Sequence, residues 1–193
     1  LSPMMVHYCQ TKTGLTDPAN TILFYRLGDF YEMFFEDATL VSKELELTLT
    51  GKDCGMEERA PMCGIPYHAA EGYINRLVEN GHKVAICEQM EDPKQAKGMV
   101  KREVIRVVTP GTTLIPQGLD ETKNNYIMSI VCMEGCFGIS TADISTGQCL
   151  VTEMDKPRRL VDEITKFMPA EIICNQSFLL CGIDVEDLRT RLH

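Results

Sequence analysis

Long hydrophobic runs, an export signal and an excess of basic residues are all missing from this sequence of 193 residues. No apolar run approaches the ~18 residues that a membrane-spanning helix needs. The first residues have neither a basic segment nor a long apolar core, so they do not resemble a signal peptide. The 44% hydrophobic and 24% charged residues are ordinary for a globular protein. We therefore expect a cytoplasmic protein with no membrane segment.

Positive charge is scarce overall. The chain carries 19 Lys and Arg against 28 Asp and Glu, a net charge of −9, and neither the part before residue 115 nor the part after it is basic. This balance argues against a strongly basic nucleic-acid binder. The stretch 94–106 is an exception, since it holds five basic residues and one acidic residue. Local positive charge is enough to contact DNA, with a modest affinity that salt weakens.

Histidine is rare, with four residues, and the nine cysteines form no C-x-x-C motif. An odd number of cysteines in a chain without an export signal favours reduced thiols over a disulfide framework. The nearest pair, Cys132 and Cys136, lacks the two further ligands that a zinc site needs. The sequence therefore predicts no metal site.

The common catalytic motifs are also absent: G-x-x-x-x-G-K-[ST], G-x-S-x-G and H-E-x-x-H do not occur. Asp143, at the end of an expected strand, is a candidate nuclease carboxylate, but a two-metal site needs several carboxylates from different strands. A metal-dependent nuclease remains the alternative function. The acidic residues Asp29, Glu32, Glu36 and Asp37 are explained more simply by the helix dipole, which favours negative charge in a first helical turn.

Hydrophobic periodicity predicts a mixed α/β protein. Asp29 is expected to begin a helix that continues to residue 45, with Glu32 completing a capping box. Residues 60–66 contain two prolines and are expected to be extended and poorly paired. The other expected helices are 4–12, 69–79, 156–168 and 185–192. The expected strands are 22–25, 83–87, 104–108, 126–132, 137–143, 149–153 and 171–174.

The polar segment 116–125 is the expected linker between two domains, 1–115 and 126–193. Three short strands followed by a helix, a strand and a helix give the second domain the order βββαβα, which is typical of α/β layers.

Four segments of the first domain resemble the MutS family of DNA mismatch-recognition proteins. They are LFYRLGDFYEMF at 23–34, PMCGIPYHA at 61–69, VAICEQ at 84–89 and VVTPGT at 107–112. Four long matches in the right order are far more specific than one short motif. The resemblance is strong to about residue 115, and weaker to the family's connector domain beyond it, with ADISTG at 142–147 as the best segment.

The resemblance implies a C-terminally truncated bacterial protein: a mixed α/β mismatch-binding domain followed by an incomplete, RNase H-like connector domain. The fragment would have no enzymatic activity and no cofactor of its own. The full-length parent would be an ATPase that uses ATP and Mg, forms a homodimer through the missing domains and works with a MutL-type protein. Its ligand would be double-stranded DNA with mismatches or small loops.

Phe30 and Glu32 match the Phe-x-Glu motif with which the family recognises a mismatch in the minor groove. An aromatic wedge must unstack a base step, which costs a few kcal/mol, and a mispaired base lowers that cost. Glu32 would repel the phosphates of a perfect duplex and hydrogen-bond a displaced base. Without the resemblance, Phe30 reads as part of a core stripe and Glu32 as a helix cap.

Two further segments are possible contacts of the DNA backbone. The resemblance brings the proline-containing segment at 66–69 close to the DNA, although Tyr67 reads equally well as a core residue. The basic stretch lies beside it and suits phosphate contacts. The candidate residues are Pro66, Tyr67, His68, Ala69, Lys94, Lys97, Lys101, Arg102 and Arg106.

Overall fold

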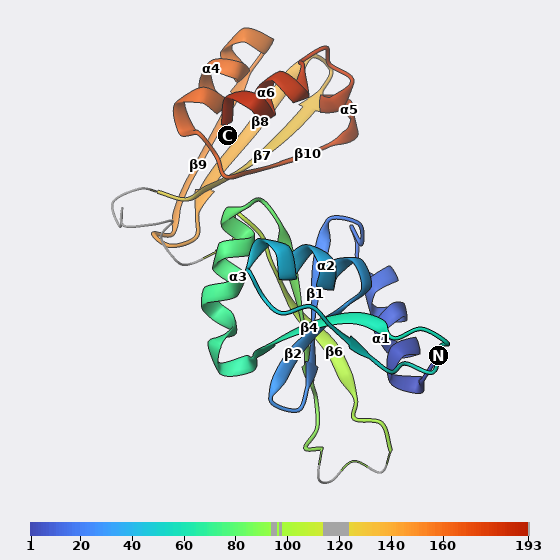
Figure 1. Ribbon diagram of the computed structural model, residues 1–193. Coiled ribbons are helices and arrows are strands. Elements are labelled where there is room, and N and C mark those ends of the chain that lie inside the picture. Colours follow the sequence, from blue (N-terminus) through green and yellow to red (C-terminus); the bar gives the residue numbers. More distant parts are fainter. Residues whose placement is uncertain (94–95, 97, 114–123, 193) are drawn as a thin grey trace. The chain divides into compact units, whose positions relative to one another are not determined.

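The computed structural model describes residues 1–93, 96, 98–113 and 124–192. The chain forms two compact units, Leu1–Thr109 and Pro110–His193, each with its own sheet and hydrophobic core (Figure 1). The mixed α/β class is confirmed. The expected linker at 116–125 falls for the most part outside the described residues. Within the described ranges, no helix is long and apolar enough to cross a bilayer.

A six-stranded sheet forms the centre of the first unit, in the order β3-β4-β2-β1-β5-β6. Strands β1 and β5 are parallel, and the other neighbours are antiparallel. The strands are β1 (Thr21–Leu27), β2 (Phe30–Phe34), β3 (Thr50–Lys52), β4 (Ala60–Pro66), β5 (Lys83–Gln89) and β6 (Arg102–Val108).

Helices cover both faces of this sheet (Figure 1). Helices α2 (Phe35–Glu44) and α3 (Ala70–Glu79) pack on one face, and α1 (Pro3–Thr13) packs on the other. A short 3₁₀ turn, η1 (Tyr67–Ala69), precedes α3. Because both faces are covered, the first five residues of β1 are all buried, as expected for a strand at the centre of a layered α/β unit.

The helix expected from Asp29 to residue 45 is wrong in its first part. Residues 30–34 form strand β2, which pairs with β1 as a hairpin, and α2 begins only at Phe35. The Asp29–Glu32 capping box therefore does not exist. A φ of 55° at Phe35 allows the chain to turn directly from strand into helix. The spacing of apolar residues could not distinguish the two structures, because the apolar positions of 30–34 fit a helix and a strand buried on both faces equally well.

The expectation that residues 60–66 are poorly paired is also wrong. They form β4, which pairs with β2 on one side and with β3 on the other. Its two prolines, Pro61 and Pro66, lie near the two ends of the strand. The residues between them keep their N–H groups for the ladder, which is how a paired strand tolerates proline.

The second unit contains a four-stranded sheet in the order β10-β7-β8-β9, with β10 parallel to β7. One face of the sheet packs against helices around a core that includes Met128, Ile139 and Leu160. The expected βββαβα order is confirmed, with one extra short helix. The elements are β7 (Tyr126–Met133), β8 (Cys136–Asp143), β9 (Gln148–Met154), α4 (Pro157–Phe167), β10 (Glu171–Cys174), α5 (Gln176–Leu179) and α6 (Val185–Leu192).

Candidate nucleic-acid interface

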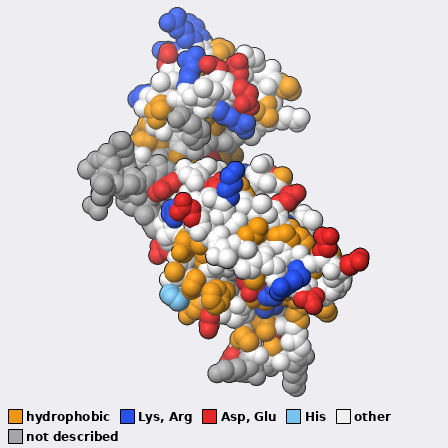
Figure 2. All heavy atoms as spheres, viewed as in Figure 1, with side chains coloured by type: hydrophobic (Ala, Val, Ile, Leu, Met, Phe, Trp, Pro, Cys, Tyr) orange, Lys and Arg blue, Asp and Glu red, His pale blue; other side chains and the backbone are white. Residues whose placement is uncertain are grey.

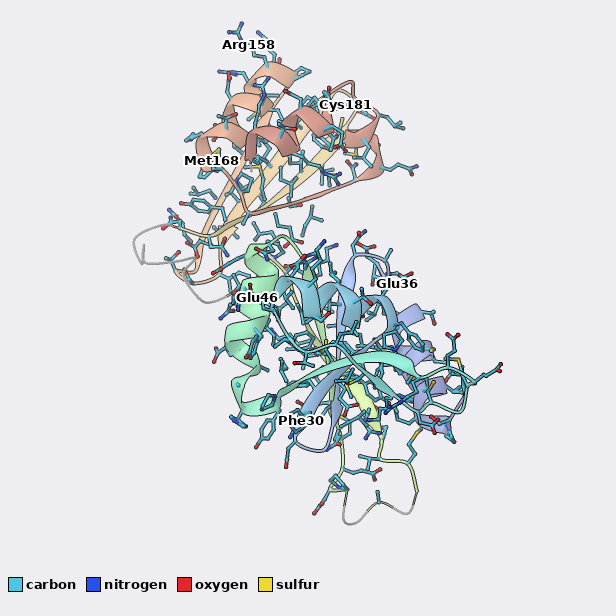
Figure 3. The ribbon with its side chains drawn as sticks, viewed as in Figure 1. Phe30, Glu36, Glu46, Arg158, Met168 and Cys181 are labelled. Atoms are coloured by element: carbon cyan, nitrogen blue, oxygen red, sulfur yellow. The ribbon has the colours of Figure 1, made fainter. Side chains whose placement is uncertain are left out.

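The β1–β2 hairpin presents Phe30 beside its turn. Gly28 and Asp29 connect the two strands, and Leu27 pairs with Phe30. Gly28 has a φ of 60°, a left-handed value that glycine adopts at little cost and that tight hairpin turns need. Phe30 is 46% exposed, and it is labelled near the hairpin turn in Figure 3. The hairpin thus presents a half-exposed aromatic ring at the end of two paired strands.

Neighbouring elements hold this turn in place. The N–H of Gly28 donates to Oε1 of Gln89 at 3.0 Å, and the N–H of Tyr67 donates to the carbonyl of Asp29 at 2.9 Å. The guanidinium of Arg26 lies 3.6 Å from the centre of the Tyr67 ring, and its Nε donates to the carbonyl of Gly28 at 2.5 Å. Strand β5 and the η1 turn therefore both brace the hairpin.

Glu88 strengthens the brace from the opposite face of the sheet. Its carboxylate accepts a hydrogen bond from Nη1 of Arg26 at 3.3 Å and another from the hydroxyl of Tyr31. Burial, together with the hydrogen bond to Glu88 and its negative charge, raises the pKa of Tyr31 to about 12. The Tyr31 hydroxyl therefore keeps its proton at neutral pH and remains a donor to Glu88.

Glu32 follows Phe30 by two residues and lies on the same face of β2. Its neighbour on β4 is Gly64. A Cβ atom at Gly64 would lie 3.6 Å from Cγ of Glu32 and 3.8 Å from Cδ1 of Phe30, so both side chains border a strip of bare backbone. Nζ of Lys52, from β3, donates to Oε2 of Glu32 at 2.5 Å. The motif residues thus form one small surface with an aromatic ring beside a paired carboxylate.

The structure brings the segment 66–69 next to this surface. Pro66 pairs with Phe30 in the β2–β4 ladder. Tyr67 is 45% exposed, so it is not a core residue, and its ring meets that of His68 edge-on with centroids 5.8 Å apart. His68 and Ala69 are also exposed. Pro66 and Tyr67 are thus attached to the hairpin, and His68 and Ala69 follow them in the exposed η1 turn.

The basic stretch divides into residues with different environments. Lys94 and Lys97 lie outside the described residues. Lys101 and Arg106 are exposed, although Nζ of Lys101 lies 2.7 Å from Oε1 of Glu103. Arg102 is 8% exposed, and its guanidinium is bound within the unit. On the face in Figure 2, Lys and Arg side chains lie scattered among acidic ones rather than in one continuous basic area.

Arg102 is therefore a structural residue of the hairpin brace. Its Nε donates to the carbonyl of Arg26 at 2.7 Å, and Nη1 donates to the carbonyl of Val100 at 2.8 Å. Its guanidinium also lies 5.2 Å from the centre of the Tyr25 ring. With its donors used inside the protein, Arg102 is poorly placed to bind a phosphate, and we leave it out of the proposed interface.

The acidic residues near the hairpin do not converge on one point. Glu32 pairs with Lys52, whereas Asp37, at 7% exposure, accepts hydrogen bonds from Nζ of Lys12 at 2.7 Å and from the N–H of Leu23 at 2.9 Å. Asp37 thereby ties α1, β1 and α2 together. No group of three or more His, Cys, Asp or Glu side chains arranged to hold a metal occurs in the described ranges.

Asp143 has a structural role at the end of β8. One oxygen accepts hydrogen bonds from the N–H and the hydroxyl of Ser145 at 2.8 and 2.6 Å, and the other accepts from the N–H of Asn125 at 3.2 Å. Burial alone would raise the pKa of Asp143, but these hydrogen bonds outweigh it and hold the pKa below its ordinary value. Nothing in the described part of the chain supports the nuclease alternative.

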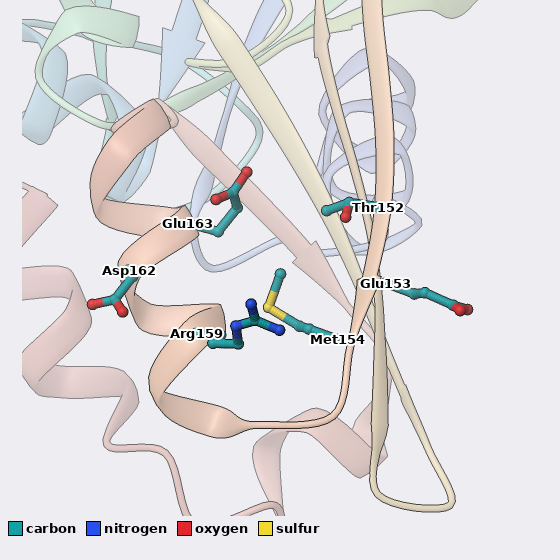
Figure 4. A pocket seen from close by; sticks show the side chains of 6 residues that line it. All are labelled: Thr152, Glu153, Met154, Arg159, Asp162 and Glu163. Carbon is teal, nitrogen blue, oxygen red and sulfur yellow. The ribbon is translucent and has the colours of Figure 1, made fainter.

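A hollow of about 310 Å³ lies between β9 and α4 of the second unit (Figure 4). Arg159 and Met154 point toward one another inside it, whereas Glu153 points away from it. Its lining mixes both charges with a thioether and presents no arrangement suited to one ligand. The residues around it are Thr152, Glu153, Met154, Arg159, Asp162 and Glu163.

Three residues of the interface were not singled out by the sequence. Lys52 stands in strand β3, which is not among the expected strands, Gly64 has no chemistry of its own, and Glu88 faces the side of the sheet away from Phe30. Their importance depends on strand pairing between distant segments, which no local pattern reveals. The hairpin itself had one signal in the sequence. The Gly-Asp pair at 28–29 lies between two apolar runs, and such pairs are typical of hairpin loops.

An exposed aromatic ring beside a carboxylate on a braced hairpin is an arrangement suited to the class of nucleic-acid-binding proteins, because bases stack on such rings. Comparisons with known proteins agree with that class. The family model described as MutS domain I matches residues 2–116, and the model described as MutS domain II matches residues 125–190. The chain belongs to the MutS family.

Three similar proteins each carry the name DNA mismatch repair protein MutS. The chain is 65% identical over 191 residues to the protein of Lachnoclostridium phytofermentans, 56% over 181 residues to that of Acetivibrio thermocellus, and 52% over 182 residues to that of Caldanaerobacter subterraneus. These alignments cover 99%, 92% and 93% of this chain but 20%, 20% and 21% of the relatives. The chain thus spans about a fifth of the length of these relatives.

Proposed function

We propose that this chain recognises mispaired or unpaired bases in double-stranded DNA during mismatch repair, as the amino-terminal part of a MutS protein. The observation that carries the proposal is Phe30, an exposed ring on a braced hairpin with Glu32 beside it. In this proposal 1–115 is the mismatch-recognition domain, 126–193 belongs to the connector domain, and 116–125 joins them.

The physical basis is the cost of deforming the duplex. A ring that enters the minor groove separates two base pairs, which costs a few kcal/mol in perfect DNA. A mispaired base has already lost part of its pairing and stacking, so the same insertion costs less. Stacking on the ring returns about 1–3 kcal/mol per base. Selectivity then comes from deformability, so one ring can serve many different mismatches.

Rigidity of the hairpin matters for this mechanism. A wedge on a flexible loop would lose conformational entropy when it inserts, and that loss would reduce the net stacking energy. Here the Gly28–Asp29 turn is bonded to Gln89 and Tyr67 before any ligand arrives. The exposed residues Tyr67, His68 and Ala69 and the half-buried Pro66, with Lys101 and Arg106, are proposed to contact the phosphate backbone nearby.

The wider context is proposed from the family. The relatives are about five times as long as this chain, and we propose that the full-length protein binds ATP and Mg, dimerises and works with a MutL-type partner through regions beyond the two domains here. The chain itself is proposed to act by binding DNA, without catalysis. Because the proposed ligand is chromosomal DNA, we propose that the protein acts in the bacterial cytoplasm.

The test is Phe30→Ala in the full-length protein that carries this sequence. Loss of the ring should weaken binding to a mismatched duplex by about 1–3 kcal/mol, the range of one aromatic–base stack. Binding to a perfect duplex should hardly change, because that mode depends on phosphate contacts. Fluorescence anisotropy titrations of both duplexes at one fixed salt concentration measure the two affinities.

Phe34→Ala is the matched control, because Phe34 lies on the same strand and face but is 1% exposed. Removing this buried ring should destabilise the fold by about 3–5 kcal/mol, whereas Phe30→Ala should leave thermal unfolding nearly unchanged. The proposal is wrong if Phe30→Ala melts as early as Phe34→Ala, or if it weakens both duplexes equally.

A further inference from the structure

The carboxylate of Glu32, which we propose faces the mismatch, is ion-paired by a residue from another strand. Nζ of Lys52 lies 2.5 Å from Oε2 of Glu32. The side chains are 32% and 16% exposed, so the pair lies at the border between the interior and solvent. The Lys52 ammonium also lies 5.7 Å from the centre of the Phe34 ring, within the range of a cation–π attraction. Two separate contacts thus fix the end of the Lys52 side chain.

The strand register explains how Lys52 reaches Glu32. Lys52 pairs with Ala60 on β4, and Glu32 pairs with Gly64 on the same strand. The two charged residues therefore stand on opposite sides of β4, and the Lys52 side chain must cross it. Gly64 offers no side chain next to Glu32, and a Cβ there would already lie 3.6 Å from Cγ of Glu32. Gly64 therefore leaves the Glu32 end of the bridge free of a side chain from β4.

An ion pair in this position has two consequences for a DNA ligand. A carboxylate held by a fixed cation has fewer rotamers available, so it loses less entropy when it meets a base. The charges of Lys52 and Glu32 nearly cancel at a phosphate several ångströms away, whereas an unpaired carboxylate would repel that phosphate. The repulsion expected from Glu32 in the sequence is therefore reduced by Lys52.

We propose that Lys52 is a positioning residue that sets mismatch selectivity by orienting the Glu32 carboxylate toward the displaced base, while its charge offsets that of Glu32 toward the backbone of perfect and mismatched duplexes alike. This inference rests on the proposed function. It assigns to Lys52 a role that neither the Phe-x-Glu motif nor net charge predicts. Without Lys52, Glu32 remains present but loses its orientation, and its contribution to selectivity disappears.

A double-mutant cycle in the full-length protein tests the inference. The measured quantity is selectivity, the ratio of dissociation constants for perfect and mismatched duplexes. Glu32→Gln should lower this ratio about fivefold, as for one lost hydrogen bond. Lys52→Met should lower it by a similar factor, and the double variant should be no less selective than either single variant. Lys52→Arg should keep most of the selectivity, because it preserves the charge and the reach.

Lys43→Met is the matched control for charge. Lys43 is exposed on α2, which covers the opposite face of the same sheet, so its loss should change both affinities slightly and equally. Thermal melts of every variant separate unfolding from recognition. The inference is overturned if Lys52→Met leaves selectivity unchanged while Glu32→Gln lowers it, or if the two changes are additive. If the unmodified protein shows no selectivity at all, the proposed function fails instead.

Discussion

Phe30 and Phe34 lie four residues apart on one short strand, and their side chains have opposite environments. Both side chains point to the same face of the sheet, yet Phe30 is 46% exposed and Phe34 is 1% exposed. Helix α1 makes the difference, because the ring of Tyr8 packs edge-on against Phe34 with centroids 4.9 Å apart. The same residue type is thus a core residue where a helix covers it, and stays half exposed four positions earlier on the same strand, where we propose that it binds DNA.

Asp143 allows a prediction on pH dependence. Its hydrogen bonds hold the pKa of the native state below the ordinary value of 3.8, so the charged form stabilises the fold. A depressed pKa contributes stability that is complete above the unfolded-state pKa and is lost as the pH falls through the native pKa. Asp143→Asn should therefore lower the Tm at pH 7, and the difference from the unmodified chain should shrink below about pH 4.

Asp162→Asn serves as the control for that experiment, since Asp162 is exposed on α4 of the same unit. Its Tm should follow that of the unmodified chain at each pH. Thermal unfolding recorded by circular dichroism from pH 3 to pH 7 gives the comparison. A Tm difference for Asp143→Asn that stays constant or grows toward low pH contradicts the structural role of the carboxylate.

At the scale of secondary-structure elements, the sequence predicted type better than it predicted pairing. Helices α1, α3 and α4 and the three-stranded meander of the second unit agree with the expected elements within a few residues. These segments are governed by local periodicity and by proline and glycine, which single-sequence rules capture. The helix expected at 30–34 was wrong, and 60–66 is extended as expected but paired on both sides, because strand pairing depends on neighbours that lie far away in the sequence.

The candidate interface was likewise predictable only in the parts that do not depend on strand pairing. Family resemblance identified Phe30 and Glu32, and the structure places them side by side over Gly64. It could not identify Lys52, because the pair depends on the register of β3 on β4. The local excess of basic residues at 94–106 made Arg102 a candidate phosphate contact, although its donors face the carbonyls of Arg26 and Val100. A count of basic residues cannot distinguish a buried guanidinium from an exposed one.

The hairpin turn allows a prediction at this scale. Gly28 has a φ of 60°, and nothing lies within 4 Å of a Cβ added there, so Gly28→Ala should cost about 1–2 kcal/mol through backbone strain alone. Gly72, in α3, has equally open space and no left-handed φ. Gly72→Ala should therefore stabilise the helix by about 0.5–1 kcal/mol.

The two alanine variants have the same chemical change, so their opposite signs test the backbone argument directly. Urea titrations of both variants and the unmodified chain provide the free energies of unfolding. Equal effects at the two positions would mean that the turn is not held in the left-handed conformation. Strain at Gly28 should also reduce mismatch selectivity in the full-length protein, because the turn sets the direction of Phe30.

At the scale of the whole chain, the proposed recognition surface is combined with little positive charge for attracting DNA. Residues 1–115 carry 12 basic and 16 acidic residues, and described cations such as Lys12, Lys52 and Lys101 are paired with carboxylates. Few positive charges therefore remain to replace condensed counterions on DNA, and counterion release supplies most non-specific affinity. A wedge of one ring cannot replace that term, since one stack returns only about 1–3 kcal/mol.

The 193-residue chain alone should therefore bind DNA weakly, with a dissociation constant above about 1 μM at physiological salt, as for non-specific binding. Affinity should fall further as salt is raised, with a shallow slope that reflects few phosphate contacts. The measurement is fluorescence anisotropy with matched and mismatched duplexes at several salt concentrations, alongside the full-length protein. The full-length protein should bind the mismatched duplex far more tightly, because its further domains add contacts that hold the hairpin at the groove. Mismatch-selective binding below about 1 μM by the chain alone would contradict the prediction, and would mean that the braced hairpin and its Glu32–Lys52 pair suffice for recognition.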